Sequence, residues 1–569
     1  MSRIRTVPPQ PRPAGLAPME VVEGAAAIAE RYGTHLSDES RAAGRAERLA
    51  FPRSEADVAE ALARAAAAGM PVTVASGRTG IVAGAVPDGG LLLSTERMDA
   101  LAIEQGSRVL GLGPRSPGTE TQQPSVVPEP RTPNPEPRTP AFVARCAPGV
   151  TLARLAEELG RHDPPLFFPP NPTETTAQVG GSVAANASGA RSYRWGATRR
   201  YVVALRAVLA CGEVLALARG EALAAPDGFE IELAGGKVLR VPVPTYRMPK
   251  VKSAAGYYAA PGMDLVDLLV GSEGTLGVIT EATLALERAP ESLVSIQGFF
   301  PDEENALAFV AAIRNADPVG SLSSRTPNPE PRTQPLRGVQ AIEYFDGGSL
   351  RLLAEKRAED GPKSEVPETP ALAGAAVLVE VAGSEAEAEA ALETLAGLIE
   401  EFGGDPERAW AGIEARERAK LAAFRHALPE AVNSIIGRTR QEHPGLTKVG
   451  TDMAVPAGAL DEMLAAYRRL LGGAALRYVI FGHIGDGHLH ANVLPRDLDE
   501  YRKARALYLE LAALAIRLGG TVSAEHGIGK LKKPFLELMY GPAGIEEMRR
   551  VKRALDPQCL LGRGTMFDA

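Results

Sequence analysis

Helical and strand patterns alternate in the first half of the chain. Residues 54–69, SEADVAEALARAAAAG, combine a serine that can cap a helix, acidic residues in the first turn and a final glycine, and so predict a helix. The next residues, PVTVAS, are rich in β-branched side chains and predict a short strand. The glycine-containing loop Ser76–Gly80 follows, and LLLSTERM then predicts a second strand. Because this loop leads into a strand and not into a helix, it is no dinucleotide-binding fingerprint.

Similar patterns continue on either side of this region. Residues 18–50 are rich in Ala and Glu and predict helices. Further along, FVARCAPGVTLARLAEELGRHD predicts a strand and a helix, and YVVALRAVLACGEVLALA predicts two strands paired around Cys211–Gly212. DLVDLLVGSEGTLGVIT predicts a short helix, a glycine turn at Gly271–Gly277 and a strand from Val278. From about residue 290, helices and strands alternate without glycine loops, which indicates a separate α+β domain.

Two proline-rich segments, residues 114–140 and about 323–336, interrupt these patterns. Both contain RTPNPEPRT, at Arg131–Thr139 and at Arg325–Thr333. Pro and Thr at this density favour extended, solvated backbone that cannot build a core, and two copies are not a repeat architecture. We therefore interpret both segments as insertions into surface loops, with a polyproline docking motif for a partner as the alternative.

Composition and charge exclude several classes of protein. The chain has 569 residues, 45% of them hydrophobic and 23% charged, as in an ordinary soluble protein of about two to four domains. A formal net charge of −8 without a basic stripe argues against a nucleic-acid partner. The three cysteines, Cys146, Cys211 and Cys559, are too scattered for a disulfide framework or an iron–sulfur cluster, and they fit a reducing compartment. Since no signal peptide or transmembrane segment is found, a cytoplasmic protein is predicted, with peripheral attachment to the inner face of the membrane as an open alternative.

The segment Phe168–Gly196 is the part of the first half where a binding site is most expected. Between Gly180 and Gly189 almost every residue is Gly, Ala, Ser or Asn. Such residues leave backbone N–H groups uncovered, which suits direct contact with a large anionic cofactor. A small-residue helix start that packs closely on its neighbours explains this segment equally well when it is considered alone.

Four of the eight histidines lie in two stretches near the C-terminus, YVIFGHIGDGHLHANVLP and GGTVSAEHGIGKLKKPFLELM. A strand period of two puts His488, His490 and Asn492 on one face, and a hairpin at Gly485–Gly487 would return His483 to the same edge. Together with Glu525, these histidines predict an open site for a divalent metal, zinc in the first place. A hydrogen-bonded polar cluster without metal is the alternative.

Three further side chains near these stretches are candidates for catalysis. His526 has an imidazole that can remove a proton near neutral pH, and the glycine after it leaves space for a substrate. Arg425 and Lys448 can hold a carboxylate, although each considered alone is an ordinary surface charge.

The segments VGSEGTLGVIT, FGHIGDGHLH and SAEHGIGKLKKPF resemble those of FAD-linked oxidases of the vanillyl-alcohol-oxidase type. The similarity is to the branch of D-lactate dehydrogenases, glycolate oxidase flavoprotein subunits and D-2-hydroxyglutarate dehydrogenases, and runs from about Ala50 to the C-terminus without the two insertions. It implies an α+β fold with a two-subdomain FAD-binding domain, an α+β substrate or cap domain, and a C-terminal tail that returns to the flavin domain. The expected boundaries are 1–50 for an N-terminal extension with helices, 51–290 for the FAD-binding domain, 291–515 for the cap domain and 516–569 for the C-terminal segment.

The resemblance implies FAD, which we expect to be bound noncovalently because the first glycine loop contains no histidine or cysteine. Ser76 and Arg78 depart from a loop that is usually richer in glycine, so Arg78 either adds charge at the pyrophosphate or turns outward. The residues implied in FAD binding are Ser76, Gly77, Arg78, Thr79, Gly80, Pro170, Gly180, Gly181, Ser182, Asn186, Gly189, Gly196, Glu273, Gly274, Gly277 and Ile279.

The same resemblance assigns roles in the second half of the chain. His483, His490 and Glu525 match metal ligands, His526 matches the catalytic base, and Arg425 and Lys448 match contacts to the substrate carboxylate. His488 stands where the family usually has Asn, which could alter the surroundings of the metal. In addition, LLGRGTMF replaces a common Asn-Pro-Gly ending, which weakens any assignment to the tail.

The implied reaction is oxidation of a small D-2-hydroxy acid, D-lactate or glycolate in the first place, with hydride transfer to flavin N5. Electrons then pass to an external acceptor, which is a quinone, a cytochrome, an electron-transferring flavoprotein or a partner subunit. D-2-hydroxyglutarate as substrate, a noncatalytic flavin-binding subunit of a glycolate-oxidising complex, a nonredox flavoprotein that makes ether lipids, and a homodimer are open alternatives.

Overall fold

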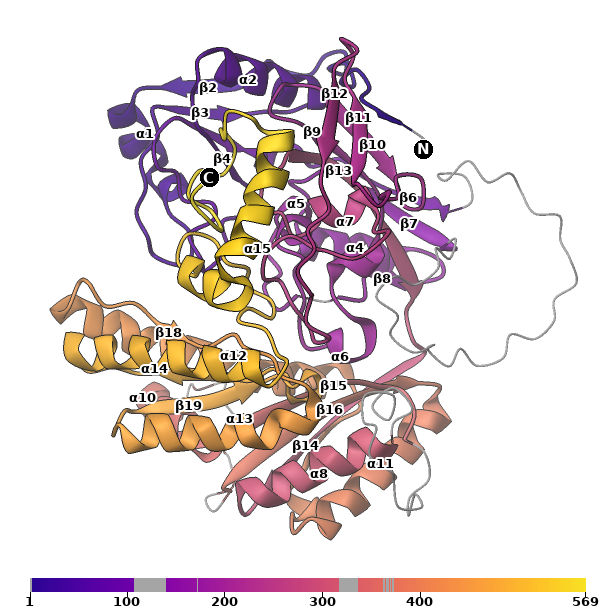
Figure 1. The fold of residues 1–569 in the computed structure, drawn as a ribbon. Helices are drawn as coiled ribbons and strands as arrows, with labels where there is room; N and C mark the ends of the chain where they lie inside the picture. Colours follow the sequence, from indigo (N-terminus) through magenta and orange to yellow (C-terminus); the bar gives the residue numbers. More distant parts are fainter. Residues whose placement is uncertain are drawn as a thin grey trace, which may run out of the picture.

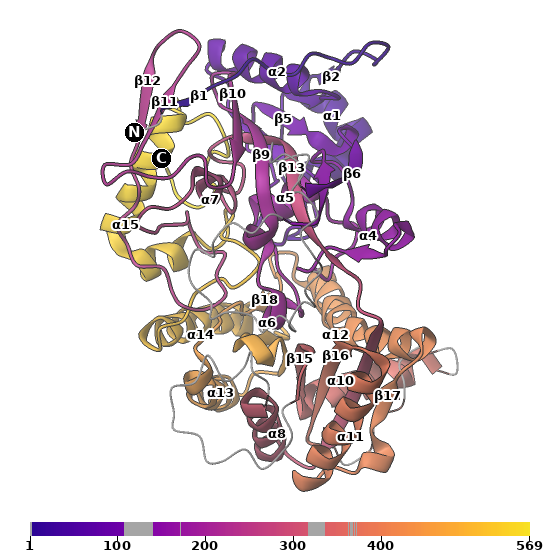
Figure 2. The same cartoon turned by 90° about the vertical axis from the view of Figure 1, so that its right-hand side faces the viewer.

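The computed structural model describes residues 3–106, 140–170, 172–316, 336–361, 364, 368, 370 and 373–569. Both copies of RTPNPEPRT, and with them nearly all of the two predicted insertions, lie outside these residues. The described chain has a two-domain α+β fold, in which three smaller sheets build one body and a single large sheet builds the other (Figures 1 and 2). The residue boundaries of the domains stay a prediction.

A four-stranded sheet in the order β2-β3-β5-β4 carries the first glycine loop. Its predicted helix begins at Ser54, where the Ser54 hydroxyl accepts the backbone N–H of Asp57 and the Asp57 carboxylate accepts that of Ser54. Because β4 and β5 are parallel, the chain must cross over between them, and it does so through the glycine loop. The elements are β2 (Glu20–Glu23), α1 (Ala25–Tyr32), β3 (Arg48–Phe51), α2 (Glu55–Ala67), β4 (Val72–Ala75) and β5 (Leu91–Ser94).

The prediction of helices over residues 18–50 was largely wrong. Only Ala25–Tyr32 is α-helical, followed by a short 3-10 turn at Gly33–Leu36, whereas β2 and β3 form an antiparallel pair. Val22 and Leu49 face each other in this pair and bury against α1. The strands are held by pairing between distant residues, which local Ala and Glu content does not report.

The second sheet confirms the predicted strand–helix, hairpin and helix–turn–strand segments. Its strands lie in the order β10-β9-β13-β7-β6, with β8 paired to the end of β13. The strands are β6 (Leu101–Gln105), β7 (Phe142–Cys146), β8 (Leu166–Phe167), β9 (Val202–Val208), β10 (Val214–Ala218) and β13 (Val278–Arg288). The helices are α4 (Leu152–Arg161), α5 (Val179–Ala184), α6 (Ser192–Trp195) and α7 (Leu265–Leu269), and a third sheet combines β1 (Ile4–Arg5), β11 (Phe229–Glu232) and β12 (Val238–Val241).

The large sheet of the second body has seven strands in the order β17-β14-β16-β15-β19-β20-β18. Period-two alternation sends Phe300 and Tyr344 into the core under α8 and α11, and Phe299 and Phe345 into the core under α10 and α12. The strands are β14 (Ser292–Phe300), β15 (Val339–Asp346), β16 (Ala375–Gly383), β17 (Trp410–Gly412), β18 (Val449–Gly450), β19 (Tyr478–Gly482) and β20 (His490–Val493). The helices are α8 (Glu303–Ala316), α10 (Gly347–Asp360), α11 (Glu385–Glu401), α12 (Ala415–Glu442), α13 (Leu460–Tyr467) and α14 (Leu498–Arg517).

After α14 the chain returns to the first body, as the resemblance implied (Figure 1). The segment α15 (Lys533–Leu555), two helices joined at a kink at Gly541, lies against that body (Figure 1). The backbone of Val72 in β4 exchanges hydrogen bonds with Leu560 and Gly562. The C-terminal tail thus extends the sheet that carries the glycine loop. Among the described residues, no helix combines the length and the apolarity that a membrane span requires.

Replacing Lys552 with methionine is expected to destabilise this attachment. Its buried ammonium group donates to the Thr275 carbonyl at 2.6 Å, to Asp556 Oδ2 at 2.6 Å and to the Leu561 carbonyl at 2.8 Å. The substitution leaves the buried Asp556 carboxylate without its cation, which costs about 3 kcal/mol of unfolding free energy. Denaturant unfolding should show this loss.

The control is Lys533→Met. Lys533 also pairs with a carboxylate, but that partner, Asp568, is 78% exposed. This pair should contribute less than about 1 kcal/mol. Equal stability of the two variants would contradict the role given to Lys552.

Candidate active site

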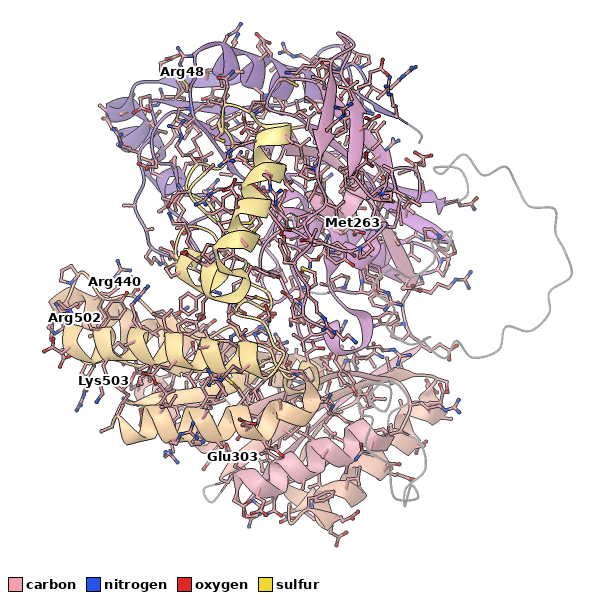
Figure 3. All side chains as sticks on the ribbon, in the orientation of Figure 1. Arg48, Met263, Glu303, Arg440, Arg502 and Lys503 are labelled. Carbon is pink, nitrogen blue, oxygen red and sulfur yellow. The ribbon has the colours of Figure 1, made fainter. Side chains whose placement is uncertain are left out.

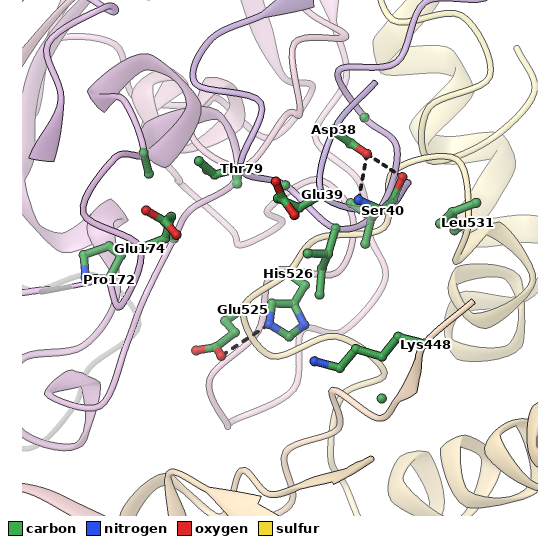
Figure 4. A pocket seen from close by; sticks show the side chains of 18 of the residues that line it. Asp38, Glu39, Ser40, Thr79, Pro172, Glu174, Lys448, Glu525, His526 and Leu531 are labelled. Carbon is green, nitrogen blue, oxygen red and sulfur yellow. Dashed lines mark hydrogen bonds and ion pairs between the residues drawn. The ribbon is translucent and has the colours of Figure 1, made fainter. Parts of the chain in front are cut away.

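A cavity of about 940 Å³ has walls from both bodies. The loop after β4, the start of α5 and the turn before β13 line one side. The helix α12, β18, and the β19–β20 hairpin line the other, and the segment before α15 contributes Glu525 and His526 (Figure 4). A space of this size, formed between two bodies, is typical of a ligand or cofactor site.

The loop after β4 presents uncovered backbone donors to this cavity. The four consecutive N–H groups of Gly77–Gly80 donate to no acceptor within the described chain. The loop is held against the segment before α5, where the Ser76 hydroxyl donates to Gln178 Oε1 at 2.9 Å. Orphan donors that line a cavity form a site for an anionic group.

The small residues at the start of α5 are compatible with both explanations given for them, close packing and a place on the wall of a binding site. A Cβ atom on Gly180 would lie only 2.4 Å from Cβ of Pro148, so close packing requires glycine there. The same segment lines the cavity through Gly180, Gly181 and Ser182.

Most of the residues expected to bind FAD line the cavity, and their individual roles stay a prediction. The four that do not line it are Pro170, Asn186, Gly189 and Gly196. Asn186 is buried, where its amide oxygen accepts the backbone N–H of Arg199 at 2.9 Å. The lining residues are Ser76, Gly77, Arg78, Thr79, Gly80, Gly180, Gly181, Ser182, Glu273, Gly274, Gly277 and Ile279.

Two charged residues on this wall have protein partners. Arg78 pairs with Glu96 at 3.0 Å, and hydrogen bonds from His35 and Arg78 lower the pKa of Glu96 to about 2. Glu273 accepts the backbone N–H groups of Ile528 and Gly529 at 2.8 and 2.7 Å, while burial raises its pKa to about 7. Glu273 therefore connects the glycine turn before β13 to the segment that carries His526.

Three histidines of the β19–β20 hairpin converge on Glu525. His483 Nε2 and His490 Nε2 each lie 3.4 Å from a Glu525 oxygen, and His488 Nδ1 lies 4.0 Å away. One nitrogen or oxygen from each of the four residues lies within 4.8 Å of all the others. Three imidazole nitrogens and one carboxylate oxygen are suitable ligands for a divalent transition metal.

The outer nitrogen of each of these histidines is held by a partner. His483 Nδ1 lies 2.5 Å from Glu343 Oε1, His488 Nε2 lies 3.1 Å from Asp452 Oδ1, and His490 Nδ1 lies 2.6 Å from the Thr451 carbonyl. Such contacts fix the tautomer and direct the other ring nitrogen inward, as they do for histidines that bind metals.

His526 lies at the edge of this cluster and lines the cavity (Figure 4). Its Nε2 lies 3.5 Å from Glu525 Oε1, and its Nδ1 lies 3.4 Å from Oδ2 of the buried Asp452. Burial lowers the pKa of His526 to about 4, so its imidazole is neutral at neutral pH. A neutral imidazole at a cavity wall is able to accept a proton from a ligand.

The two candidate carboxylate-binding residues differ in their surroundings. Arg425 Nε lies 2.9 Å from Glu343 Oε2, and its Nη2 donates to Thr173 Oγ1 at 3.1 Å. Lys448 lines the cavity with its side chain open to solvent, and partial desolvation by the surrounding cavity wall lowers its pKa to about 8. Lys448 thus offers a cation that has no carboxylate partner within the described chain.

Comparisons with known proteins agree with this arrangement. Residues 46–119 and 138–218 match the model described as "FAD binding domain", and residues 337–566 match "FAD linked oxidases, C-terminal domain". "Probable D-lactate dehydrogenase, mitochondrial" of Danio rerio is 30% identical over 75% of this chain and 72% of its own length. The chain belongs to the FAD-linked oxidases.

Two further comparisons bear on the family and on the fold, respectively. "Glycolate oxidase subunit GlcD" of Bacillus subtilis (strain 168) is 28% identical over 75% of each chain. A solved structure of alkyldihydroxyacetonephosphate synthase superposes with a TM-score of 0.56 over 98% of this chain and 87% of the other. At 13% identity this likeness shows the fold alone.

The loop after β4, the start of α5 and the turn before β13 form one side of the cavity, which we call the glycine wall. This wall fits the cofactor of the family. The orphan N–H groups of Gly77–Gly80 are suitable donors to a pyrophosphate. The protein is therefore an FAD-dependent oxidoreductase, and the glycine-rich side of the cavity faces the histidine cluster across the same space.

The sequence did not predict the residues that contact the outer side of the histidine–glutamate cluster. Glu343 and Asp452 hold His483 and His488, and Lys252 Nζ lies 3.0 Å from Glu525 Oε2. Lys252, in VKSAAGYY, offered no local signal because a single lysine in a loop is ordinarily a surface charge. Only its side-chain exposure of 5% distinguishes it.

Proposed function

We propose that this protein oxidises a small D-2-hydroxy acid to the corresponding 2-oxo acid, with D-lactate and glycolate as the first candidates. One observation carries the proposal: the neutral His526 faces a single cavity that also contains the uncovered glycine wall and the histidine–glutamate cluster. The names of the relatives, a D-lactate dehydrogenase and a glycolate oxidase subunit, support the same class of substrate.

Each side chain of the cavity has a distinct task in this proposal. Lys448 and Arg425 hold the substrate carboxylate. Asp452 lies beside Nδ1 of His526 and favours the tautomer that carries its proton on Nδ1. His526 therefore accepts the hydroxyl proton of the substrate on Nε2. When bound, FAD supplies the hydride acceptor, and a divalent metal at His483, His490 and Glu525 supplies a Lewis acid. The substrate thus loses a hydride from C2 and a proton from its hydroxyl group.

Reoxidation of the flavin is proposed to need an external acceptor. The three cysteines are too few to bind an iron–sulfur cluster through four thiolates, so this chain supplies no such relay. A quinone, a cytochrome, an electron-transferring flavoprotein or a partner subunit would take the electrons.

D-2-hydroxyglutarate is a second candidate because of two arginines farther along the cavity. Arg440, in the last turn of α12, and Arg505 of α14 both line it. Figure 3 labels Arg440 on the second body. No carboxylate of the described chain pairs with either of them. They would suit the additional carboxylate of a dicarboxylic substrate.

An anaerobic absorbance titration with D- and L-2-hydroxy acids tests the proposal. The flavin band at about 450 nm should bleach with D-lactate and not with L-lactate, or should bleach with glycolate, which is achiral. Greater bleaching by D-2-hydroxyglutarate than by D-lactate or glycolate would favour the second candidate. A flavin that no 2-hydroxy acid reduces would overturn the dehydrogenase proposal and favour a noncatalytic flavin-binding subunit.

The Michaelis constant for the acid is expected to rise as the pH increases through about 8. Lys448 has its pKa lowered to about 8, so above that pH it loses the charge that holds the substrate carboxylate. A lost charge-assisted hydrogen bond weakens binding about tenfold or more. Steady-state kinetics from about pH 6 to about pH 10, a range that brackets the lowered pKa of about 8, would measure the change.

Lys448→Arg is the matched control for this dependence. Its guanidinium stays charged over the same range, so the Michaelis constant should not rise near pH 8. An unchanged rise in this variant would assign the titration to another group.

A further inference from the structure

His488 is the member of the histidine cluster that the proposed function leaves without a task. Its side chain is fully buried between the β19–β20 hairpin and the segment around Asp452. We propose that His488 Nδ1 is a fourth protein ligand of the metal, so that three imidazoles and Glu525 surround the ion. The inference rests on the metal site of the proposed function.

The tautomer of His488 follows from its contact with Asp452. Asp452 also accepts hydrogen bonds from the Lys532 ammonium group at 2.7 Å and from the Ser523 hydroxyl at 2.6 Å. An ionised carboxylate only accepts hydrogen bonds, so His488 Nε2 carries the proton and donates to Asp452 Oδ1 at 3.1 Å. The lone pair of His488 therefore lies on Nδ1.

This lone pair has no hydrogen-bond partner within the described chain. His488 Nδ1 is buried, and no donor lies within hydrogen-bonding distance of it. The nitrogen instead faces Glu525 Oε2 at 4.0 Å, toward the point where His483 Nε2 and His490 Nε2 also converge. An unsatisfied buried acceptor is costly, and a shared metal ion would satisfy it.

The charges around the cluster are compatible with a divalent cation. Three basic groups beside the cluster each contact an acid: Arg425 lies 2.9 Å from Glu343, Lys532 2.7 Å from Asp452, and Lys252 3.0 Å from Glu525. Asp486 adds a fourth carboxylate, 3.8 Å from Lys252. These four acids and three bases together carry a net negative charge, which favours binding of a cation beside them.

A fourth protein ligand restricts how a substrate could reach the metal. Four ligands complete a tetrahedral site, so direct contact with a substrate requires five- or six-coordination. Metals that prefer octahedral surroundings, such as Mn²⁺ or Fe²⁺, offer that position more readily than tetrahedral zinc. If His488 is a ligand, a zinc-only site is less suited to the reaction.

Ligand counting on the wild-type protein tests the inference directly. The full-length, FAD-containing protein is stripped with a chelator, loaded with Co²⁺, and studied by X-ray absorption and visible spectroscopy. Chelator competition gives the Co²⁺ affinity of the wild type, of His488→Asn and of the control His162→Asn. His162 directly follows α4 and lies outside the cluster. Retention of FAD and circular dichroism identify variants that fold.

Three imidazoles in the wild type, two in His488→Asn, and at least about tenfold weaker Co²⁺ binding by that variant are expected. His162→Asn should bind Co²⁺ like the wild type. Two imidazoles in the wild type would overturn the role of His488 while the proposed metal site stands. Failure of the wild type to bind any metal would overturn both, and the wild-type measurement remains decisive even if His488→Asn does not fold.

Discussion

Replacing His526 with glutamine should lower the rate of flavin reduction by a 2-hydroxy acid by about 10²–10⁴-fold, the usual contribution of a general base. Glutamine keeps a polar side chain of similar length but cannot accept the hydroxyl proton at neutral pH. His526 is neutral, and the buried Asp452 beside it keeps its ion pair with Lys532, so the replacement leaves no buried charge without a partner. Anaerobic stopped-flow absorbance would measure the rate, and the ratio of flavin to protein should remain that of the wild type.

His443→Gln is the control for this experiment. His443 ends α12 outside the cavity, where its backbone and not its ring accepts the hydrogen bond from Leu446. Its replacement should leave the rate of flavin reduction unchanged. A His526→Gln protein that reduces its flavin at the wild-type rate would assign the proton to another group.

Loss of the metal is expected to lower the rate of flavin reduction by a comparably large factor. The substitution His490→Ala removes an imidazole whose Nε2 lies 3.4 Å from Glu525 and whose Nδ1 is bound to the Thr451 carbonyl. Without a Lewis acid at the hydroxyl group, the barrier to reduction should rise by about 4 kcal/mol, which corresponds to roughly a thousandfold lower rate. Metal analysis together with stopped-flow reduction would measure both consequences.

Chelation of the wild type should reproduce this loss, and added metal should restore activity to the wild type but not to His490→Ala. The flavin spectrum before substrate addition should not change in either case, because FAD and metal occupy opposite sides of the cavity in the proposal. Wild-type protein that remains fully active after its metal has been removed would contradict a catalytic metal.

The sequence predicted the histidine cluster because its signal is local. In HLHANV the strand period alone brings His488 and His490 to one side, and the hairpin that returns His483 is only a few residues long. The outer partners of these histidines were not predictable in this way. Glu343 reaches His483 because its neighbour Tyr344 pairs with Gly482, a register set across the whole large sheet.

The difference between local signals and long-range pairing also explains why the prediction of helices over residues 18–50 in the first body was largely wrong. The helix over residues 55–67 carries its own cap and was predicted, whereas β2 and β3 depend on each other and were not. Glu273 also shows that local sequence signals do not reveal contacts between residues far apart in the chain. Its place in a glycine turn was evident, but its bonds to Ile528 and Gly529 connect residues more than 250 positions apart.

Those bonds of Glu273 also bear on how the protein matures during translation. The glycine wall is synthesised early, whereas His526 and Glu525 follow almost the entire cap domain and are fixed beside that wall by Glu273 and the tail. A nascent chain can therefore build the glycine-rich side of the cavity long before it has the proposed base or the complete histidine–glutamate cluster. Since domains emerge and fold from the N-terminus, a stalled or truncated product could carry flavin without turning over substrate.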